Sequence, residues 1–284
     1  MRILNEIEYA KELEQKGFIQ KKYGFELKIL AKYYYSQGIG GDELKTKLIA
    51  FCNKYIPKYN EIKYMKMINN ACRYGEDYSL FIVKPVRITP TEIEKIQKLN
   101  NLKVEKVAFV LLVLANINKQ SYSLYIKDKI NKIIKINNAK KKPQEWEILK
   151  KSFPHIHKGY YVNNGINEIF KLAKVCLNKK EKNAIMKKLI DEEFISMTYS
   201  CKYKLDYVFH QEEENAVIIN SFDDFVLEYD YLIGDNIGHC AYCEKPFRIR
   251  SNKHKYCSKC AREVWNEYNK EKQKEYYHKN KNSV

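Results

Sequence analysis

Four cysteines near the C-terminal end have the spacing of a metal site. Cys240 and Cys243 form one C-x2-C pair, and thirteen residues later Cys257 and Cys260 form a second. Each pair lets two thiolates converge on one ion across a tight turn, and two pairs complete the tetrahedral sulfur set of structural zinc. Chance rarely places two such pairs within 21 residues. The spacing therefore predicts one structural Zn2+ ion held by these four residues.

The residues around the cysteines predict a small zinc module. A hairpin is expected between the two pairs, and a helix is expected to start at Ala261. The positive end of a helix dipole favours the thiolate of a cysteine placed there, as Cys260 would be. A knuckle, a hairpin and a helix around one metal are typical of a treble-clef or zinc-ribbon finger. His239 and His254 are only substitute ligands, because four cysteines already complete the shell.

Basic residues on this module are candidate phosphate contacts. Residues 239–284 hold twelve Lys and Arg against five Glu, a formal charge of +7. In the tail, lysines are interleaved with Trp265, Tyr268 and Tyr276, a mixture that suits a nucleic-acid backbone. A stripe of glutamates at four-residue spacing opposes this interpretation and stabilises the helix by pairing with lysines. The hairpin candidates are Arg248, Arg250, Lys253 and Lys255.

The whole chain is strongly basic. It has 284 residues, with 52 Lys and Arg against 35 Asp and Glu, a net charge of +17 and a pI near 9.3. Such a charge attracts polyanions, and nucleic acid is the usual partner of a chain of this kind. A lysine-rich surface can also serve only for solubility. Charge alone leaves both interpretations open.

The remaining composition predicts a protein of a reducing cytoplasm. Residues 1–14 do not resemble a signal peptide, and no apolar run approaches the ~18 residues of a membrane helix. The longest apolar run, Val107–Ala115, fits a buried core helix. Clustered cysteines in that compartment indicate metal rather than disulfides. The other cysteines are predicted to be free, buried thiols: Cys52, Cys72, Cys176 and Cys201.

The pattern along the chain predicts a mainly α fold with small β ribbons, in three domains. Residues 1–85 read as a helical domain, because apolar residues recur at helical spacing between breaks at Gly17 and at residues 38–41. Thr89, Pro90 and Glu92 then form a proline-containing capping box that starts a new helix. Residues 86–235 are predicted to be a winged-helix-like domain, and residues 236–284 a zinc finger with a basic helical tail.

The middle domain has the element order of a winged helix-turn-helix. A positioning helix is expected over 167–175, a turn over 176–178, a recognition helix over 179–191, and then a two-stranded ribbon. The exposed side of the recognition helix offers donors to phosphates and base edges. The alternatives are a packing unit that binds nothing and a protein-binding module. The candidate DNA contacts are Lys179, Lys180, Lys182, Asn183 and Lys187.

No pattern in the chain supports catalysis. The acidic stretch 223–235 lacks the D-(x)n-E-x-K arrangement of metal-dependent nucleases, so a solvated acidic helix face is expected there. A nuclease of the HNH type also uses C-x2-C pairs, but it needs catalytic histidines, and His254 has no partner Asp-His pair. No P-loop, G-x-G-x-x-G or Ser/His/Asp set occurs. The chain is therefore predicted to be no enzyme and to have no small-molecule substrate.

Four segments carry a resemblance to known sequences. They are the run 107–115, Asn167–Ala173 (NEIFKLA), Phe222–Phe225 (FDDF) and the finger ending Tyr256–Trp265 (YCSKCAREVW). Together they resemble uncharacterised proteins from phages and integrated elements of low-GC Gram-positive bacteria. The finger is similar to the C-terminal zinc fingers of CGNR-type regulators, although Cys260-Ala-Arg-Glu stands in place of the CGNR turn. The resemblance implies a mobile-element setting in the cytoplasm of a bacterial host.

Two functions are expected from these observations. The first is a non-catalytic DNA-binding protein of a phage or mobile element, which regulates transcription or organises replication through the winged helix and the finger. The second is a protein-binding effector that captures a host protein or nucleoprotein complex, for anti-defence or host takeover. No membrane partner is expected in either case.

Overall fold

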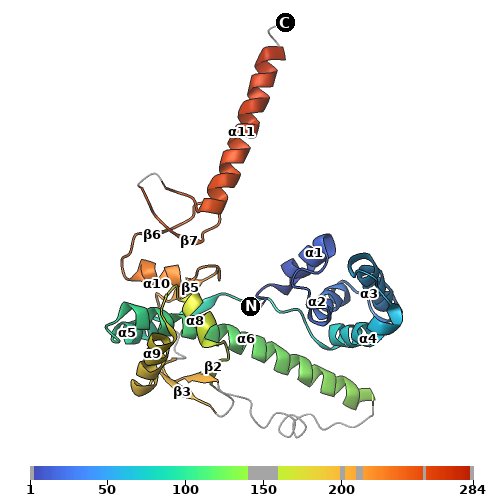
Figure 1. The fold of residues 1–284 in the computed structure, drawn as a ribbon, viewed down its shortest axis with the longest axis horizontal. Coiled ribbons are helices and arrows are strands. Elements are labelled where there is room, and N and C mark those ends of the chain that lie inside the picture. Colours follow the sequence, from blue (N-terminus) through green and yellow to red (C-terminus); the bar gives the residue numbers. More distant parts are fainter. Residues whose placement is uncertain (1–2, 140–158, 199–201, 209–213, 252–253, 282–284) are drawn as a thin grey trace. The chain divides into compact units, whose positions relative to one another are not determined.

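The computed structural model describes residues 3–139, 159–198, 202–208, 214–251 and 254–281. The fold is mainly helical, with small antiparallel sheets (Figure 1). The chain divides into two compact units, one of Met1–Lys84 with Asn116–Tyr160 and one of Pro85–Ala115 with Tyr161–Val284. The mainly α class is thereby confirmed, and the division into three domains stays a prediction.

Four helices form most of the first unit: α1 (Glu6–Lys16), α2 (Tyr23–Ser36), α3 (Gly41–Tyr55) and α4 (Glu61–Asp77). Gly17 caps α1 with φ of 79°, a left-handed conformation that suits glycine. The expected break between α2 and α3 lies at residues 37–40. Both predicted helix breaks are confirmed. Each depends only on neighbouring residues, which is why the sequence alone could predict it.

Helices α2 and α4 approach each other closely at Gly75. A Cβ atom at Gly75 would lie 2.8 Å from the carbonyl carbon and the oxygen of Ala31. Backbone atoms cannot turn aside as a flexible side chain can, so this contact requires glycine. The packing of α4, which carries Tyr74, depends on it.

The second unit is built on the first part of α6 (Leu102–Ala139), preceded by β1 (Val86–Ile88) and α5 (Pro90–Gln97). The predicted capping box of α5 is present, with Thr89 and Glu92 bonded reciprocally. Every residue of the apolar run 107–115 is buried, as predicted. The helix continues well past this run, because no proline or glycine interrupts it before Ala139.

In the residues that the structure describes, three small antiparallel sheets complete the fold. Strand β1 pairs with β5 (Val217–Ile219). Strands β2 (Tyr160–Val162), β4 (Tyr203–Leu205) and β3 (Ile195–Met197) lie in the order β2-β4-β3. Between β2 and β3 the chain forms α8 (Ile166–Leu172) and α9 (Lys179–Asp191), and after β5 it forms α10 (Val226–Leu232). The third sheet pairs β6 (Ile237–His239) with β7 (Pro246–Arg248).

We expect Gly75→Ala to destabilise the protein by about 1–3 kcal/mol, because the new methyl group overlaps the backbone of Ala31. Chemical denaturation followed by circular dichroism measures this change. Gly24→Ala is the matched control in α2, since a Cβ atom there meets only the Met67 side chain at 3.6 Å. The gain in helix propensity should make that control neutral or stabilising by up to about 1 kcal/mol. Equal effects of the two substitutions would contradict the close packing.

Candidate functional site

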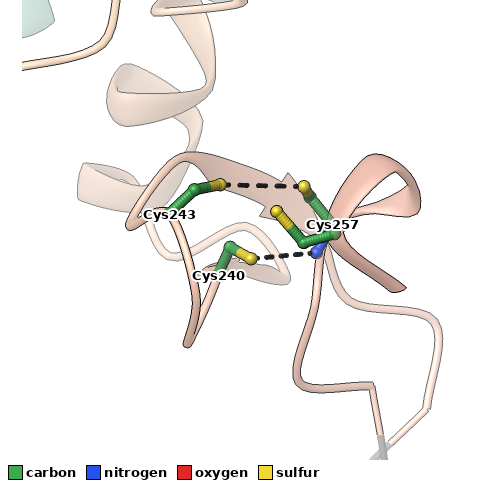
Figure 2. Close-up of side chains that lie close together, drawn as sticks. Cys240, Cys243 and Cys257 are labelled. Carbon is green, nitrogen blue, oxygen red and sulfur yellow. Dashed lines mark hydrogen bonds between the residues drawn. The ribbon is translucent and has the colours of Figure 1, made fainter. Parts of the chain in front are cut away.

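The four cysteines of the predicted metal site lie together. Their sulfur atoms are all within 4.8 Å of one another. Figure 2 shows three of them, with the Sγ atoms of Cys243 and Cys257 separated by 3.8 Å. Four sulfurs at about 2.3 Å from a tetrahedral ion are about 3.8 Å apart, whereas a disulfide bond measures about 2.05 Å. The thiols are unbonded to one another, and their arrangement is that of a metal site.

Short local elements position these sulfurs. The turn between β6 and β7 carries Cys240 and Cys243, and Glu244 closes it with φ of 58° and an N–H bond to the carbonyl of Cys240. Cys257 directly precedes α11 (Ser258–Lys281), and Cys260 lies in the first turn of that helix. The helix starts three residues earlier than the predicted Ala261. Cys260 is therefore within the helix, still at its positive end.

Little apolar surface stabilises this module. The buried members of its core cluster are Cys240, Phe247 and Cys260, and the partly buried residues around them include two more cysteines, Cys243 and Cys257. A core of this size is too small to offset the conformational entropy of the segment, as in other small metal-dependent domains. A bound ion would supply the missing folding free energy.

Protons and metal compete for these sulfurs. Burial raises the pKa of the Cys240 thiol, but backbone N–H groups of Cys257, Tyr242 and Cys243 outweigh it and lower that pKa to about 6. The N–H of Cys257 lies 3.3 Å from the Cys240 sulfur (Figure 2). Burial and the neighbouring thiols raise the pKa of Cys260, and burial raises that of Cys243. Cys240 therefore holds a negative charge readily, whereas deprotonation of Cys243 and Cys260 is favoured by a bound cation.

The two histidines of the module have other partners. The Nδ1 atom of His254 accepts the backbone N–H of Arg250 at 3.3 Å, and its ring packs edge-on against Phe247. The Nε2 atom of His239 lies 3.0 Å from a carboxylate oxygen of Glu228. Within the described part of the chain, the candidate metal cluster comprises the four cysteines alone.

The expected solvent exposure of the acidic stretch is confirmed for Asp223, Asp224 and Asp235 but is wrong for Asp230, which forms a second charged centre. The residue is 1% exposed, and Glu228 beside it is also buried. The Nζ atom of Lys106 in α6 lies 2.6 Å from Oδ1 of Asp230 in an ion pair without hydrogen-bond alignment. Arg248 in β7 donates to Oδ2 at 3.1 Å. A buried carboxylate needs such partners, so α10 is an internal element.

A signal for this centre is present in the sequence. Glu228 and Asp230 alternate with Val226, Leu227 and Tyr229, which are apolar or aromatic. Charges set within an apolar segment are usually paired, because an unpaired buried charge is costly. That signal identifies a buried carboxylate, but it does not identify the partner.

The predicted contacts on α9 are mostly exposed. Lys179, Lys180, Asn183 and Lys187 face solvent. Lys182 is half-buried and donates to the side chain of Asn167 at 3.0 Å. That lysine links α9 to α8 and is less available to an external phosphate.

The predicted hairpin contacts differ from one another. Arg248 is engaged with Asp230, whereas Arg250 and Lys255 are exposed. Lys253 lies outside the described residues.

Among the other cysteines, Cys52 is buried, and burial raises its pKa to about 12. Cys176 is exposed in the turn before α9, so the prediction of a buried thiol is wrong there. Cys201 is outside the described residues.

Comparison of the sequence with protein-family models and with curated proteins, and of the fold with solved structures, gives no match. No helix in the described part of the chain is both long and apolar enough to cross a membrane.

We expect Asp230→Asn to reduce the free energy of unfolding by about 2–3 kcal/mol. The loss stays below that of a fully buried pair because Arg248 is partly in water. Denaturant titration measures it. Asp224→Asn is the control in the same acidic segment, where an exposed pair with Lys174 should be worth at most about 1 kcal/mol. A loss at Asp224 as large as at Asp230 would contradict the assignment of Asp230 as the internal bridge.

Proposed function

We propose that this chain is a non-catalytic, zinc-containing DNA-binding protein. The observation that carries the proposal is the exposed basic face of α9, set on a scaffold with the element order of a winged helix. The mobile-element setting, and a role in transcription control or replication, rest on the sequence resemblance alone. The proposal is developed below for the metal, the scaffold and the reading helix in turn.

Zinc is the metal that best fits the cysteine cluster. Four thiolates form the closed tetrahedral set that structural zinc prefers, and the sulfur separations agree with that geometry. A closed shell leaves no position for a substrate or an activated water. Zinc would therefore serve folding of the module rather than chemistry, and a treble-clef or zinc-ribbon finger is the fitting description.

The middle of the chain supports a winged helix. A strand, two helices and a hairpin follow one another as β2, α8, α9, β3 and β4, and the first strand pairs with the last to give the order β2-β4-β3. Asn178 caps α9 in a reciprocal capping box with Glu181, which fixes where the second helix begins. In helix-turn-helix proteins this second helix enters the major groove.

The exposed residues of α9 form a consistent face. Lys180, Asn183 and Lys187 recur at intervals of three and four and line one side of the helix. Met186 and Leu189 on the other side are buried. Lysines supply phosphate contacts, and an asparagine side chain can pair with an adenine edge. The face therefore combines charge for affinity with one residue able to read sequence.

A non-catalytic role agrees with the histidines. His254, the residue closest to an HNH arrangement, has its Nδ1 atom engaged by the backbone N–H of Arg250. Its ring packs on Phe247 as part of the module. A histidine held in this way has a structural role in the finger.

A protein-binding effector is the second candidate, and α11 favours it. The helix runs for 24 residues, and Trp265, Tyr268 and Tyr276 on it are 62%, 49% and 65% exposed. Exposed tryptophan and tyrosine are typical anchors of protein interfaces. Loss of a co-purifying host protein in Trp265→Ala, with DNA binding intact, would favour this function over the first.

We expect purified protein to contain about one equivalent of zinc, held by the closed cysteine shell. Cys257→Ser should lose most of the metal and unfold the module, whereas Cys176→Ser, an exposed cysteine outside the cluster, should keep it. Elemental analysis and circular dichroism check both. Zinc added to metal-free protein at pH 7 should release at least about two protons, because the pKa values of Cys243 and Cys260 are raised.

The pH dependence of zinc binding has a defined sign. The pKa of Cys240 is lowered to about 6, so this sulfur is a thiolate above that pH and is protonated below it. Zinc affinity should therefore fall more steeply as pH drops through about 6. A zinc content unchanged by Cys257→Ser would contradict the four-sulfur site.

We expect the double variant Lys180→Glu, Lys187→Glu to bind duplex DNA at least about tenfold more weakly. The log-log salt slope should flatten by about two, one unit for each lost phosphate contact. Thermal stability should not change, because both side chains are exposed. Fluorescence anisotropy at several salt concentrations measures the binding.

The charge-matched control is Lys11→Glu, Lys66→Glu, which reverses two exposed lysines of the first unit. It should leave duplex binding within about twofold of wild type, since general attraction by net charge is weak at moderate salt. Equal losses in the two double variants would show that net charge, rather than α9, governs binding.

A further inference from the structure

Four tyrosine rings of the first unit form a row, the tyrosine ladder: Tyr74, Tyr78, Tyr125 and Tyr122. Successive ring centroids are separated by 4.3, 5.7 and 6.4 Å, with interplanar angles of 28°, 3° and 30°. Tyr74 belongs to α4, Tyr78 follows it, and the other two belong to α6. Tyr122 and Tyr125 are 38% and 41% exposed, more than tyrosines that serve only as core.

Lysines lie over these rings. The Nζ atom of Lys28 is 4.9 Å from the centroid of Tyr74. That of Lys129 is 5.3 Å from Tyr78 and 5.5 Å from Tyr125. These distances are within the range of cation–π contacts. Each cation is thus held beside an aromatic face, and the ladder combines stacking surface with positive charge.

The residues after α4 are clamped along α6, which fixes the ladder. The backbone N–H and the hydroxyl of Ser79 both donate to the buried carboxylate of Asp128, at 2.9 and 2.8 Å. Farther along, Lys84 and Gln120 exchange two hydrogen bonds. The rings are therefore positioned before any ligand arrives, which lowers the entropic cost of binding.

The same helix segment is almost free of acids. Residues 116–135 contain five lysines and a single acid, Asp128, whose carboxylate is occupied by Ser79. Of those lysines, Lys132 pairs with Asp77 at 2.5 Å. Lys119 and Lys129 lie one turn from Tyr122 and Tyr125 on the same side of α6, and together with Lys28 they give the ladder its positive charge.

The ladder adjoins a cavity of about 530 Å³, to which Tyr78 also contributes. Three lysines and three acids line the cavity, so it adds room beside the ring and no net charge. The phosphate-attracting part of this surface is therefore Lys28, Lys119 and Lys129 beside the rings, and the cavity offers space for an unpaired base or sugar.

We propose that the tyrosine ladder and the lysines beside it bind single-stranded nucleic acid. Flat aromatic faces stack on unpaired bases, whereas a duplex hides its base faces within the helix. The lysines beside the rings contact the backbone phosphates. This surface lies in a different unit from α9 and takes a different form of nucleic acid, so it goes beyond the duplex-binding function proposed above.

The test uses the full chain and a labelled oligo-dT of about 15 nucleotides, a length within the range of single-strand sites. Tyr122→Ala, Tyr125→Ala should bind it about tenfold more weakly, since one stacked base is worth about that factor. Tyr122→Phe, Tyr125→Phe keeps both rings and should bind within about twofold of wild type. Phe25→Ala, which removes an exposed ring of the same unit outside the ladder, should have no effect. Circular dichroism confirms that each variant folds.

The outcomes separate this proposal from the duplex-binding one. Loss of oligo-dT binding with duplex binding intact supports the ladder, and the Lys180→Glu, Lys187→Glu variant should show the reverse pattern. Wild-type affinity in the double alanine variant overturns the proposal. An equal loss in the phenylalanine variant also overturns it, because the hydroxyl groups rather than the rings would then matter. If polyglutamate displaces oligo-dT from wild type but not from the alanine variant, the surface fits an acidic protein and the proposal fails.

Discussion

A buried carboxylate requires compensating charge, and Asp230 shows how far this requirement organises the second unit. Its partners are Lys106 from the core helix α6 and Arg248 from β7. Neither partner is near Asp230 in the sequence, so the carboxylate is compensated only when α6, α10 and β7 are assembled together. The cysteine module is therefore joined to its unit by an ion pair as well as by the chain. Nearby, the hydroxyl of Tyr229 donates to Glu105, and the same α10–α6 contact gains a buried hydrogen bond.

Strand β7 connects this centre to the cysteine cluster. Side chains alternate between the two faces of a strand, so neighbouring residues serve different partners. Phe247 packs with the cysteines, whereas Arg248 reaches Asp230. The pairing of Gly238 with Phe247 keeps the register, and a Cβ atom at Gly238 would lie 2.7 Å from the side chain of Ile249. Metal binding, which would order the cysteine turn, is thus linked through one three-residue strand to the salt bridge that attaches the module.

Features that depend on a few neighbouring residues were predictable from the sequence. The C-x2-C spacing places four sulfurs within 4.8 Å. The start of α9 at Lys179 follows from the cap at Asn178, and the box at Thr89 starts α5 as expected. In each case the information lies within one or two turns of chain, where backbone geometry restricts the outcome. The burial of the run 107–115 was equally readable, because nine consecutive apolar residues have no other stable environment in water.

Features that depend on distant residues were decided by the tertiary structure. Asp230 looked like part of a solvated acidic face, because its partner Lys106 is 124 positions away in the sequence. Arg248 looked like a phosphate contact for the same reason. The tyrosine ladder joins rings from two helices that no local pattern relates. The sequence by itself determined the cysteine set, the main helices and the basic charge. Only the tertiary structure decided which charged side chains form ion pairs within the protein and which remain exposed on its surface, because long-range pairing depends on the whole packed fold.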